Sequence, residues 1–340
     1  MNAISVITSI LYLLSGVGVF LVACSMMSSN LEALSGSKIK SLFSKAEKSK
    51  LLGVAVGATT TAVLQSSSAA SVMVISFVNG GVMTLAQAAT VIFGANVGTT
   101  VTGQLAALGA LGGEVVLIPA VLASFSLVGA AVYALSKSER AKRAGGAVSG
   151  FGMLFVGLAV MSGAMSKFSQ SDALKSFIGL FENPLMLVLV GTLLTAVVQS
   201  SSVMTSIAIT MAGAGLITVN QGIYIAMGAN VGTCVTALFA GLSGSCNGKR
   251  VALIHLLFNV GGVIVFMLVG LIMGFFGTDY GRLFGVAFPS SPQVQLAMFH
   301  TAFNIVSVII FLPLTNALVR LVVRLVPEER KKQAKTLQSA

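Results

Sequence analysis

Residues 59–102 read TTTAVLQSSSAASVMVISFVNGGVMTLAQAATVIFGANVGTTVT, and much of this stretch returns later in the chain. Residues 193–236 align with it without a gap, at an offset of 134, and 19 of the 44 positions are identical. Two polar motifs recur in it: Gln-Ser-Ser-Ser at 65–68 and 199–202, and Gly-Ala-Asn-Val-Gly-Thr at 94–99 and 228–233. Biased composition does not reproduce polar motifs at a constant spacing, so the chain contains a duplicated structural unit.

The composition indicates a protein with many membrane spans. Of the 340 residues, 56% are hydrophobic and 9% are charged, whereas soluble domains carry about 25% charged residues. Several apolar stretches reach the roughly 20 residues that a span needs. The first, 4–28, lacks a basic leader, so we expect a retained helix and not a signal peptide. The net charge of +11 indicates membrane orientation and not a nucleic-acid partner, because the basic residues lie between apolar spans.

Each copy is predicted to contain five elements in the same order. These are a span (4–28; 145–166), a polar connection (29–50; 167–183), two short arms joined at Gln-Ser-Ser-Ser (51–64 and 69–80; 184–198 and 203–215), a segment broken at Gly-Ala-Asn-Val-Gly-Thr (84–111; 217–243) and a closing span (115–136; 251–276). A last span, 294–319, follows. Arms too short to cross a bilayer, joined by a polar turn, are typical of a re-entrant hairpin.

The predicted fold is therefore an all-α polytopic membrane protein with an inverted-topology repeat, two re-entrant helical hairpins and broken transmembrane helices. It divides the chain into the first transmembrane helix (1–28), the rest of repeat 1 (29–143), repeat 2 (144–276), a loop with the final helix (277–320) and a basic cytoplasmic tail (321–340).

The basic residues support the inversion. Each unit has three spans, an odd number, so the second copy should lie upside down relative to the first. With 29–50 placed inside, 17 of the 20 Lys and Arg residues fall on the inner side, and only Lys167, Lys175 and Arg282 fall outside. This positive-inside bias predicts an outer N-terminus and a cytoplasmic C-terminus. Inverted repeats with interrupted helices are typical of secondary transporters, whose site lies at the midplane.

The polar residues expected at the midplane are neutral, which indicates the kind of ligand. All nine carboxylates fall in predicted loops, connections or the tail, whereas proton relays usually use intramembrane Asp, Glu or His. Gln, Ser and Thr oxygens with unwound carbonyls can instead hold sodium. The candidate sodium-binding residues are Gln65, Gln199, Asn96, Thr99, Thr100, Asn230, Thr233, Thr205 and Ser206.

An anion would be bound without Lys or Arg. Each serine run begins the second arm of its hairpin, where backbone N–H groups and the helix dipole attract anions and serine caps the helix. Two inverted hairpins would aim both ends at one point, which suits a small tetrahedral oxyanion. The candidate substrate-binding residues are Ser66, Ser67, Ser68, Ser200, Ser201 and Ser202.

Structural roles for these residues remain open alternatives. Serines in membrane helices often bridge helices or bond a preceding carbonyl, and the glycines can be close-packing sites. His255 and His300 each precede an Asn by four residues, at 259 and 304, a spacing that favours a structural interhelical bond over pH sensing.

At its doubled Gln-Ser-Ser-Ser motif, each copy followed by Gly-x-Asn-x-Gly-Thr, the sequence resembles the type II sodium/phosphate cotransporter family. The His-x-x-Phe-Asn elements at 255–259 and 300–304 are similar to that family too, and the resemblance covers roughly 10 to 320. It implies sodium-dependent transport of inorganic phosphate with both hairpins forming the site. The large extracellular loop of animal members is missing, so the chain resembles a bacterial member of the plasma membrane.

The resulting hypothesis is a sodium-coupled phosphate carrier that works by alternating access. It needs no cofactor beyond coupling sodium ions and no transition-metal site, and its partners are phosphate, sodium and the lipid bilayer; a homodimer stays open. The alternatives are a carrier of another small oxyanion and an ion channel. An enzyme with a serine nucleophile is disfavoured, because no predicted core carboxylate or Lys would activate the serines.

Overall fold

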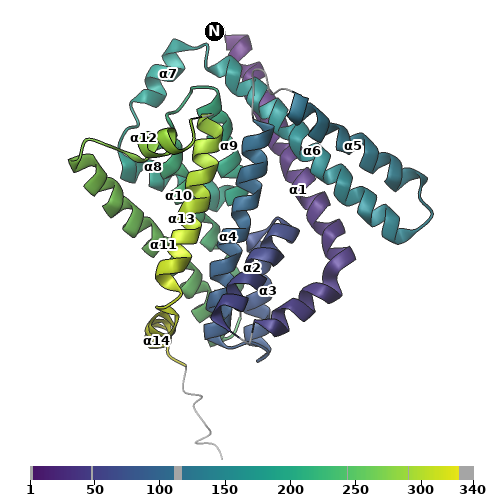
Figure 1. Cartoon of the computed structure of the whole chain (residues 1–340), viewed down its shortest axis with the longest axis vertical. Coiled ribbons are helices and arrows are strands. Elements are labelled where there is room, and N and C mark those ends of the chain that lie inside the picture. The colour runs from purple at the N-terminus through teal and green to yellow at the C-terminus, as the bar shows by residue number, and fades with distance from the viewer. Residues whose placement is uncertain (1–2, 47–48, 111–116, 243, 290, 329–340) are drawn as a thin grey trace, which may run out of the picture.

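In the described residues the protein is built from helices, of which α4 and α13 run near the vertical axis of Figure 1 and α1, α5, α6 and α11 run obliquely to it. The computed structural model describes residues 3–46, 49–110, 117–242, 244–289 and 291–328, with the side chains of 36–41, 44 and 45 left aside. Within these residues it contains fourteen helices and no strand. The helices are α1 (Ala3–Lys45), α2 (Lys50–Leu64), α3 (Ser67–Asn79), α4 (Leu85–Gly109), α5 (Leu117–Leu135), α6 (Glu139–Phe168), α7 (Asp172–Gly179), α8 (Pro184–Val198), α9 (Ser201–Gly213), α10 (Val219–Leu242), α11 (Cys246–Phe275), α12 (Tyr280–Ala287), α13 (Pro292–Phe311) and α14 (Thr315–Leu325).

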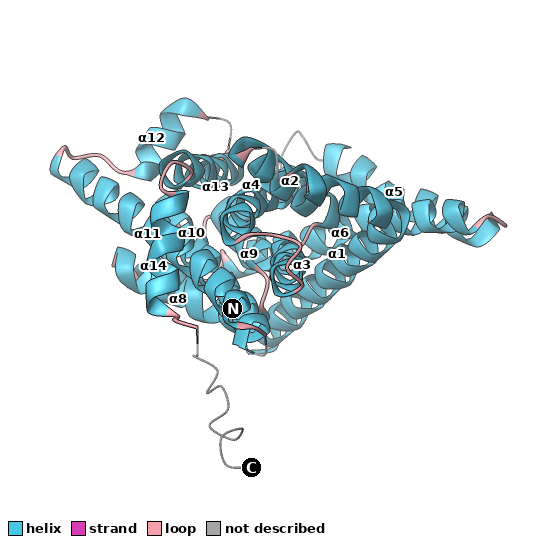
Figure 2. Ribbon diagram, turned by 90° about the horizontal axis from the view of Figure 1, so that it is seen from below, coloured by secondary structure: helices cyan, strands magenta, loops and turns pink. Residues whose placement is uncertain are grey.

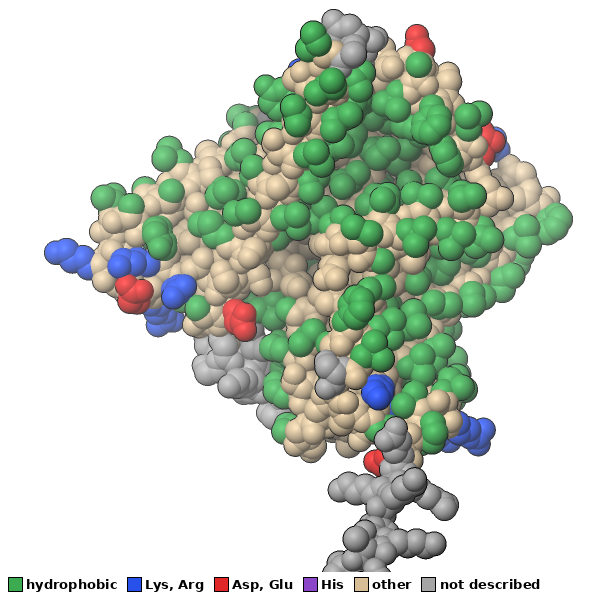
Figure 3. Space-filling view, turned by 180° about the vertical axis from the view of Figure 1, so that it is seen from behind, with side chains coloured by type: hydrophobic (Ala, Val, Ile, Leu, Met, Phe, Trp, Pro, Cys, Tyr) green, Lys and Arg blue, Asp and Glu red, His purple; other side chains and the backbone are tan. Residues whose placement is uncertain are grey.

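Seven of the described helices are long and apolar enough to cross a membrane: α1, α4, α5, α6, α10, α11 and α13. This count agrees with the seven spans expected from the sequence. Hydrophobic side chains cover much of the molecular face in Figure 3, and most of the Lys and Arg side chains visible there lie toward its extremities. Such an apolar surface has to face lipid or another protein, so the chain is a multi-pass membrane protein.

The two copies of the repeat pack their helices in the same way. Gly98 of α4 lies against the carbonyl of Ala58 in α2, and Gly232 of α10 lies against the carbonyl of Thr192 in α8. Both members of the second contact lie 134 residues beyond those of the first. The duplication in the sequence is therefore also a duplication in the packing.

The predicted breaks at Gly-Ala-Asn-Val-Gly-Thr are wrong within the described helices. Both α4 and α10 run through the motif without interruption. A Cβ at Gly94 would lie 2.7 Å from the carbonyl carbon of Val54, and one at Gly228 would lie 2.9 Å from that of Val188. The glycines let two helix backbones approach closely, which is a common role of small residues in membrane helices.

The first helices of the two repeats, α1 and α6, lie side by side (Figure 2) and run in opposite directions (Figure 1). A Cβ at Gly16 would lie 2.9 Å from the backbone nitrogen of Met161, and one at Gly150 would lie 2.7 Å from that of Met27. The two contacts are the same contact with the repeats exchanged, a reciprocity that a two-fold relation produces. α1 also continues past the predicted span, so most of the expected connection is helical.

The C-terminal part of the chain ends in two helices in place of one. The predicted span 294–319 divides into α13 and the short α14. Arg250 of α11 donates from Nε to the carbonyl oxygen of Val326 at 2.9 Å, which fixes the end of α14. Residues 329–340 of the predicted basic tail lie outside the described residues.

Candidate functional site

Each Gln-Ser-Ser-Ser motif forms the turn between two short helices. We call residues 65–68, between α2 and α3, the first tip, and residues 199–202, between α8 and α9, the second tip. Gln65 and Gln199 adopt the left-handed conformation, with φ of 52° and 57°, and no other described residue except glycine has a positive φ. Left-handed backbone in residues other than glycine is uncommon and often marks a functional turn.

The first serine of each motif caps the helix that follows. Ser66 Oγ accepts the N–H of Ala69 at 3.1 Å, and Ser200 Oγ accepts the N–H of Val203 at 3.4 Å. The glutamine therefore ends one helix, and the second serine begins the next. The same local geometry in both copies follows from the same four residues.

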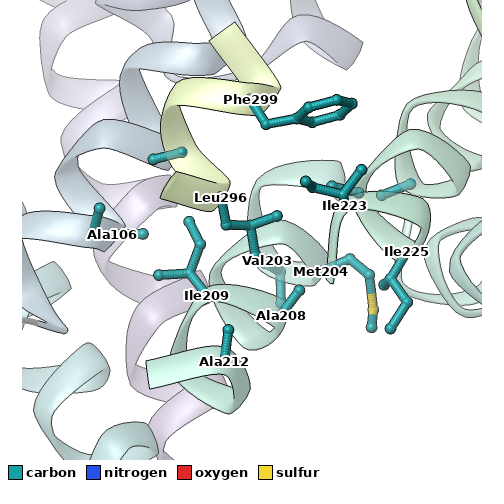
Figure 4. Packing of buried hydrophobic residues seen from close by; sticks show 14 of the residues in the cluster. Ala106, Val203, Met204, Ala208, Ile209, Ala212, Ile223, Ile225, Leu296 and Phe299 are labelled. Carbon is teal, nitrogen blue, oxygen red and sulfur yellow. The ribbon is translucent and has the colours of Figure 1, made fainter. Parts of the chain in front are cut away.

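The second tip is carried by a firmly packed helix. Side chains of α9, among them Met204 and Ile209, pack with Ile223 of α10 and with Leu296 and Phe299 of α13 (Figure 4). The α9 helix thus starts at the second tip and continues into the largest hydrophobic core of the described chain. This burial fixes the direction in which its N-terminus points.

Both tips line one cavity of about 310 Å³, which we call the tip cavity. All six predicted substrate-binding serines lie in its wall, with the predicted sodium-binding residues Gln65, Gln199 and Thr233. The described residues that line it are Cys24, Ser25, Ser28, Ser29, Glu32, Gln65, Ser66, Ser67, Ser68, Ala69, Gln199, Ser200, Ser201, Ser202 and Thr233. The structure therefore brings together motifs that lie 134 residues apart in the sequence.

The hydroxyl groups of the second and third serines are available for a ligand. Those of Ser67, Ser68, Ser201 and Ser202 make no hydrogen bond with any described part of the chain. Each motif also presents the first-turn N–H groups of α3 or α9, which attract anions. Among the described residues, neither Lys nor Arg lines the tip cavity, so an anion there would be bound by dipoles and hydroxyls.

The two glutamines at the tips are held differently. Gln65 accepts at Oε1 from the hydroxyl of Thr102 at 2.8 Å and donates from Nε2 to the carbonyl oxygen of Ala62 at 2.6 Å. Thr236 occupies the position equivalent to Thr102, but its buried hydroxyl has no partner in the described part of the chain, and Gln199 is exposed and lines the cavity. The hydrogen bond between Thr102 and Gln65 in the first copy therefore has no counterpart between Thr236 and Gln199 in the second.

The other predicted sodium-binding residues are not among the described residues that line the tip cavity. Asn96, Thr99, Thr100 and Ser206 bond carbonyl oxygens of their own helices, and Thr205 is buried without a partner.

Asn230 belongs to a network between α10 and α13. It donates to Asn304 Oδ1 at 2.9 Å, and its Oδ1 lies 3.2 Å from His300 Nε2. The interhelical role expected for His300 is therefore confirmed.

Two candidate residues were not predicted. Thr61 and Thr195 lie at equivalent positions of α2 and α8, and their buried hydroxyls have no partner among the described residues. Matching polar residues within the repeat was a signal that could have found them.

The α1 wall of the tip cavity was also missed. Glu32 lies in that wall, which corrects the expectation that every carboxylate lies away from the site. It does so because α1 remains helical through residues 29–35. The signal was weak: Ser28 and Glu32 share a helix face at a spacing of four.

Comparisons with known proteins identify a family and several relatives. The family model described as Na+/Pi-cotransporter matches twice, at residues 19–163 and 157–288. The uncharacterized protein YqeW of Bacillus subtilis is 30% identical over 311 residues, which cover 91% of this chain and 95% of the relative. The putative inorganic phosphate export protein YjbB of Escherichia coli is 25% identical over 94% of this chain, which spans only 56% of that relative.

A human relative matches over a shorter region, and no solved structure matches the chain. The human sodium-dependent phosphate transport protein 2B is 39% identical over 82 residues, which cover 23% of this chain and 12% of the relative. The family model covers both copies of the repeat. The chain belongs to the Na+/Pi-cotransporter family.

Proposed function

We propose that the chain is a sodium-coupled carrier of inorganic phosphate that works by alternating access in a bacterial plasma membrane. The observation that carries this proposal is the meeting of both tips in one hydroxyl-lined cavity, whose described lining contains no Lys or Arg. A cavity of about 310 Å³ is large enough for a small tetrahedral anion with several water molecules, given about 30 Å³ per water.

The chemistry of the tip cavity favours phosphate as the substrate. Four hydroxyls are free to donate there, and the N-termini of α3 and α9 add backbone donors. Phosphate has oxygens in a tetrahedral arrangement, so it can accept from both tips at once. The names of the Escherichia coli and human relatives also refer to phosphate export and to sodium-dependent phosphate transport.

Sodium coupling is supported by neutral oxygen atoms that have no partner. A phosphate dianion buried without Lys or Arg needs compensating cations. Thr61, Ser71, Thr195 and Thr205 offer buried hydroxyl oxygens in two equivalent pairs. Thr236 adds one in the second copy, at the position where Thr102 bonds Gln65 in the first. We assign sodium ions to the spaces that these oxygens and the predicted Gln and Thr residues border.

The inverted repeat and its re-entrant hairpins are supported by the relation between the copies. The contacts of α1 with α6 are reciprocal, and the α2–α3 pair lies lower in Figure 1 than the α8–α9 pair. The cavity extends along residues 24–32 of α1, whereas the equivalent residues of α6, 158–166, do not line it. Together with the positive-inside bias, this supports an inward-facing state with an outer N-terminus.

Uptake into proteoliposomes tests the proposal directly. Purified protein should take up labelled phosphate when an inward sodium gradient is imposed, and only weakly without it. Ser67→Ala and Ser201→Ala should abolish uptake, whereas Ser76→Ala, whose exposed hydroxyl bonds Val72 O at 3.0 Å, should not. Competition by sulfate or a small carboxylate would instead indicate another oxyanion. Large unsaturable currents would indicate a channel.

A further inference from the structure

We propose that Glu32 attracts sodium to the tip cavity and weakens the binding of phosphate there. The open side of the cavity along residues 24–32 of α1, which we call the α1 vestibule, should therefore favour phosphate release. The inference rests on the proposed function. It assigns a role to a residue outside both Gln-Ser-Ser-Ser motifs. Glu32 does not bind the substrate in this scheme; it adjusts the affinities of the two ions that share the cavity.

The position of Glu32 makes its charge act on the tip cavity. It follows Cys24 and Ser28 at intervals of four residues, so the three side chains lie on one face of α1, and all three line the cavity. Of the fifteen lining residues, Glu32 alone is charged. The structure records one ion pair between described side chains, Lys142 with Glu139, so no described partner neutralises Glu32.

The sign of the effect follows from electrostatics. A carboxylate within several ångströms of a small anion site repels a phosphate dianion and attracts a sodium ion. Glu32 is exposed, so water and dissolved salt weaken both interactions without removing them. We therefore expect changes of about three- to tenfold in the ion affinities and not an all-or-none effect.

The repeat predicts that the opposite vestibule lacks this charge. At the offset of 134, Ser28 corresponds to Ser162 and Glu32 corresponds to Ser166. In an inverted repeat, α6 would line the cavity of the outward-facing state as α1 lines the present cavity. The serine hydroxyl of position 28 is thus kept at position 162, whereas the carboxylate of position 32 has no counterpart at position 166. The two faces of the carrier should therefore differ in their relative affinity for sodium and phosphate.

Binding measurements on purified protein test this role without requiring transport. Glu32→Gln should raise the sodium concentration for half-maximal phosphate binding about three- to tenfold, and should tighten phosphate binding at saturating sodium. Glu32→Asp should remain close to the wild type. Glu139→Gln, which removes a carboxylate outside the cavity lining, should change neither quantity. N-methylglucamine chloride, an inert salt, should reduce the difference between the wild type and Glu32→Gln.

The possible failures are distinguishable. A wild-type protein that binds no phosphate at any sodium concentration would remove the proposed function and this inference with it. Sodium-dependent binding that is unchanged in Glu32→Gln would overturn the inference alone. If that variant does not fold, the wild type still decides: inert salt must raise its half-maximal sodium concentration, and an unchanged value would overturn the role of Glu32.

Discussion

Replacing Gly228 by Ala should force α8 and α10 apart. A Cβ at this position would overlap the carbonyl oxygen of Val188 and would lie 2.9 Å from both the carbonyl carbon of Val188 and the nitrogen of Thr192. Ordinary contacts begin at 3.4 Å, so the backbones must separate by about 0.5 Å, and by more at the oxygen. Overpacking of this kind costs about 1–3 kcal/mol. The better helix propensity of Ala offsets about 1 kcal/mol of that cost.

Gly163→Ala is the matched control, because Gly163 also lies within a helix but its Cβ would meet nothing within 4 Å. It keeps the gain in helix propensity without the collision. The free energy of unfolding in detergent should therefore be about 1–3 kcal/mol lower for Gly228→Ala than for Gly163→Ala. Sodium-dependent phosphate uptake should also fall in Gly228→Ala, since α8 carries the second tip. Equal stability of the two variants would refute close packing as the reason for the glycine.

Three further predictions concern the walls and supports of the tip cavity. A small thiol reagent should modify Cys24, which lines the cavity, and phosphate with sodium should slow that modification. The fully buried Cys234 should stay unmodified. Equal rates of Cys24 modification with and without the two ions would contradict this prediction. Thr102→Val should lower the free energy of unfolding by about 0.5–1.5 kcal/mol, because it removes the hydrogen bond to Gln65. Thr236→Val removes a hydroxyl without a described partner and should lower the free energy of unfolding by less. Thermal unfolding of both variants measures the two losses of stability, and equal losses would contradict this prediction. Ser66→Ala should destabilise the start of α3 by about 1 kcal/mol through the lost cap; unchanged hydrogen exchange at Ala69 would argue against that cap.

The helix pairs could be predicted from the sequence because their signals are local. The arms predicted at 51–64 and 69–80 correspond to the helices Lys50–Leu64 and Ser67–Asn79. A polar tetrapeptide between two short apolar runs is enough to place the turn between the two helices. The shared cavity followed from the repetition of that tetrapeptide in a second copy. These conclusions needed only spacing and polarity.

The state of the Gly-Ala-Asn-Val-Gly-Thr segments could not be predicted in the same way. A glycine pair is compatible with a broken helix and with a closely packed one. The choice depends on a carbonyl in another helix, that of Val54 for Gly94 and that of Val188 for Gly228. Such long-range contacts are absent from local sequence patterns.

The α1 wall of the cavity was hidden for a related reason. Residues 24–32 straddle the predicted end of a span, and their helical rotation decides whether Glu32 faces lipid, water or the site. That rotation is fixed by packing on α6, where Gly150 receives the backbone of Met27. The sequence contains Gly150 and Met27 but does not give the angle between the helices.

The central claim is that two tips from two copies form one phosphate site. Equilibrium binding of labelled phosphate to the purified chain, measured in saturating sodium, tests it most directly. We expect one phosphate per chain, with all sodium-dependent binding lost in Ser67→Ala and likewise in Ser201→Ala. Two phosphates per chain, or a loss of half the binding in each variant, would contradict a shared site.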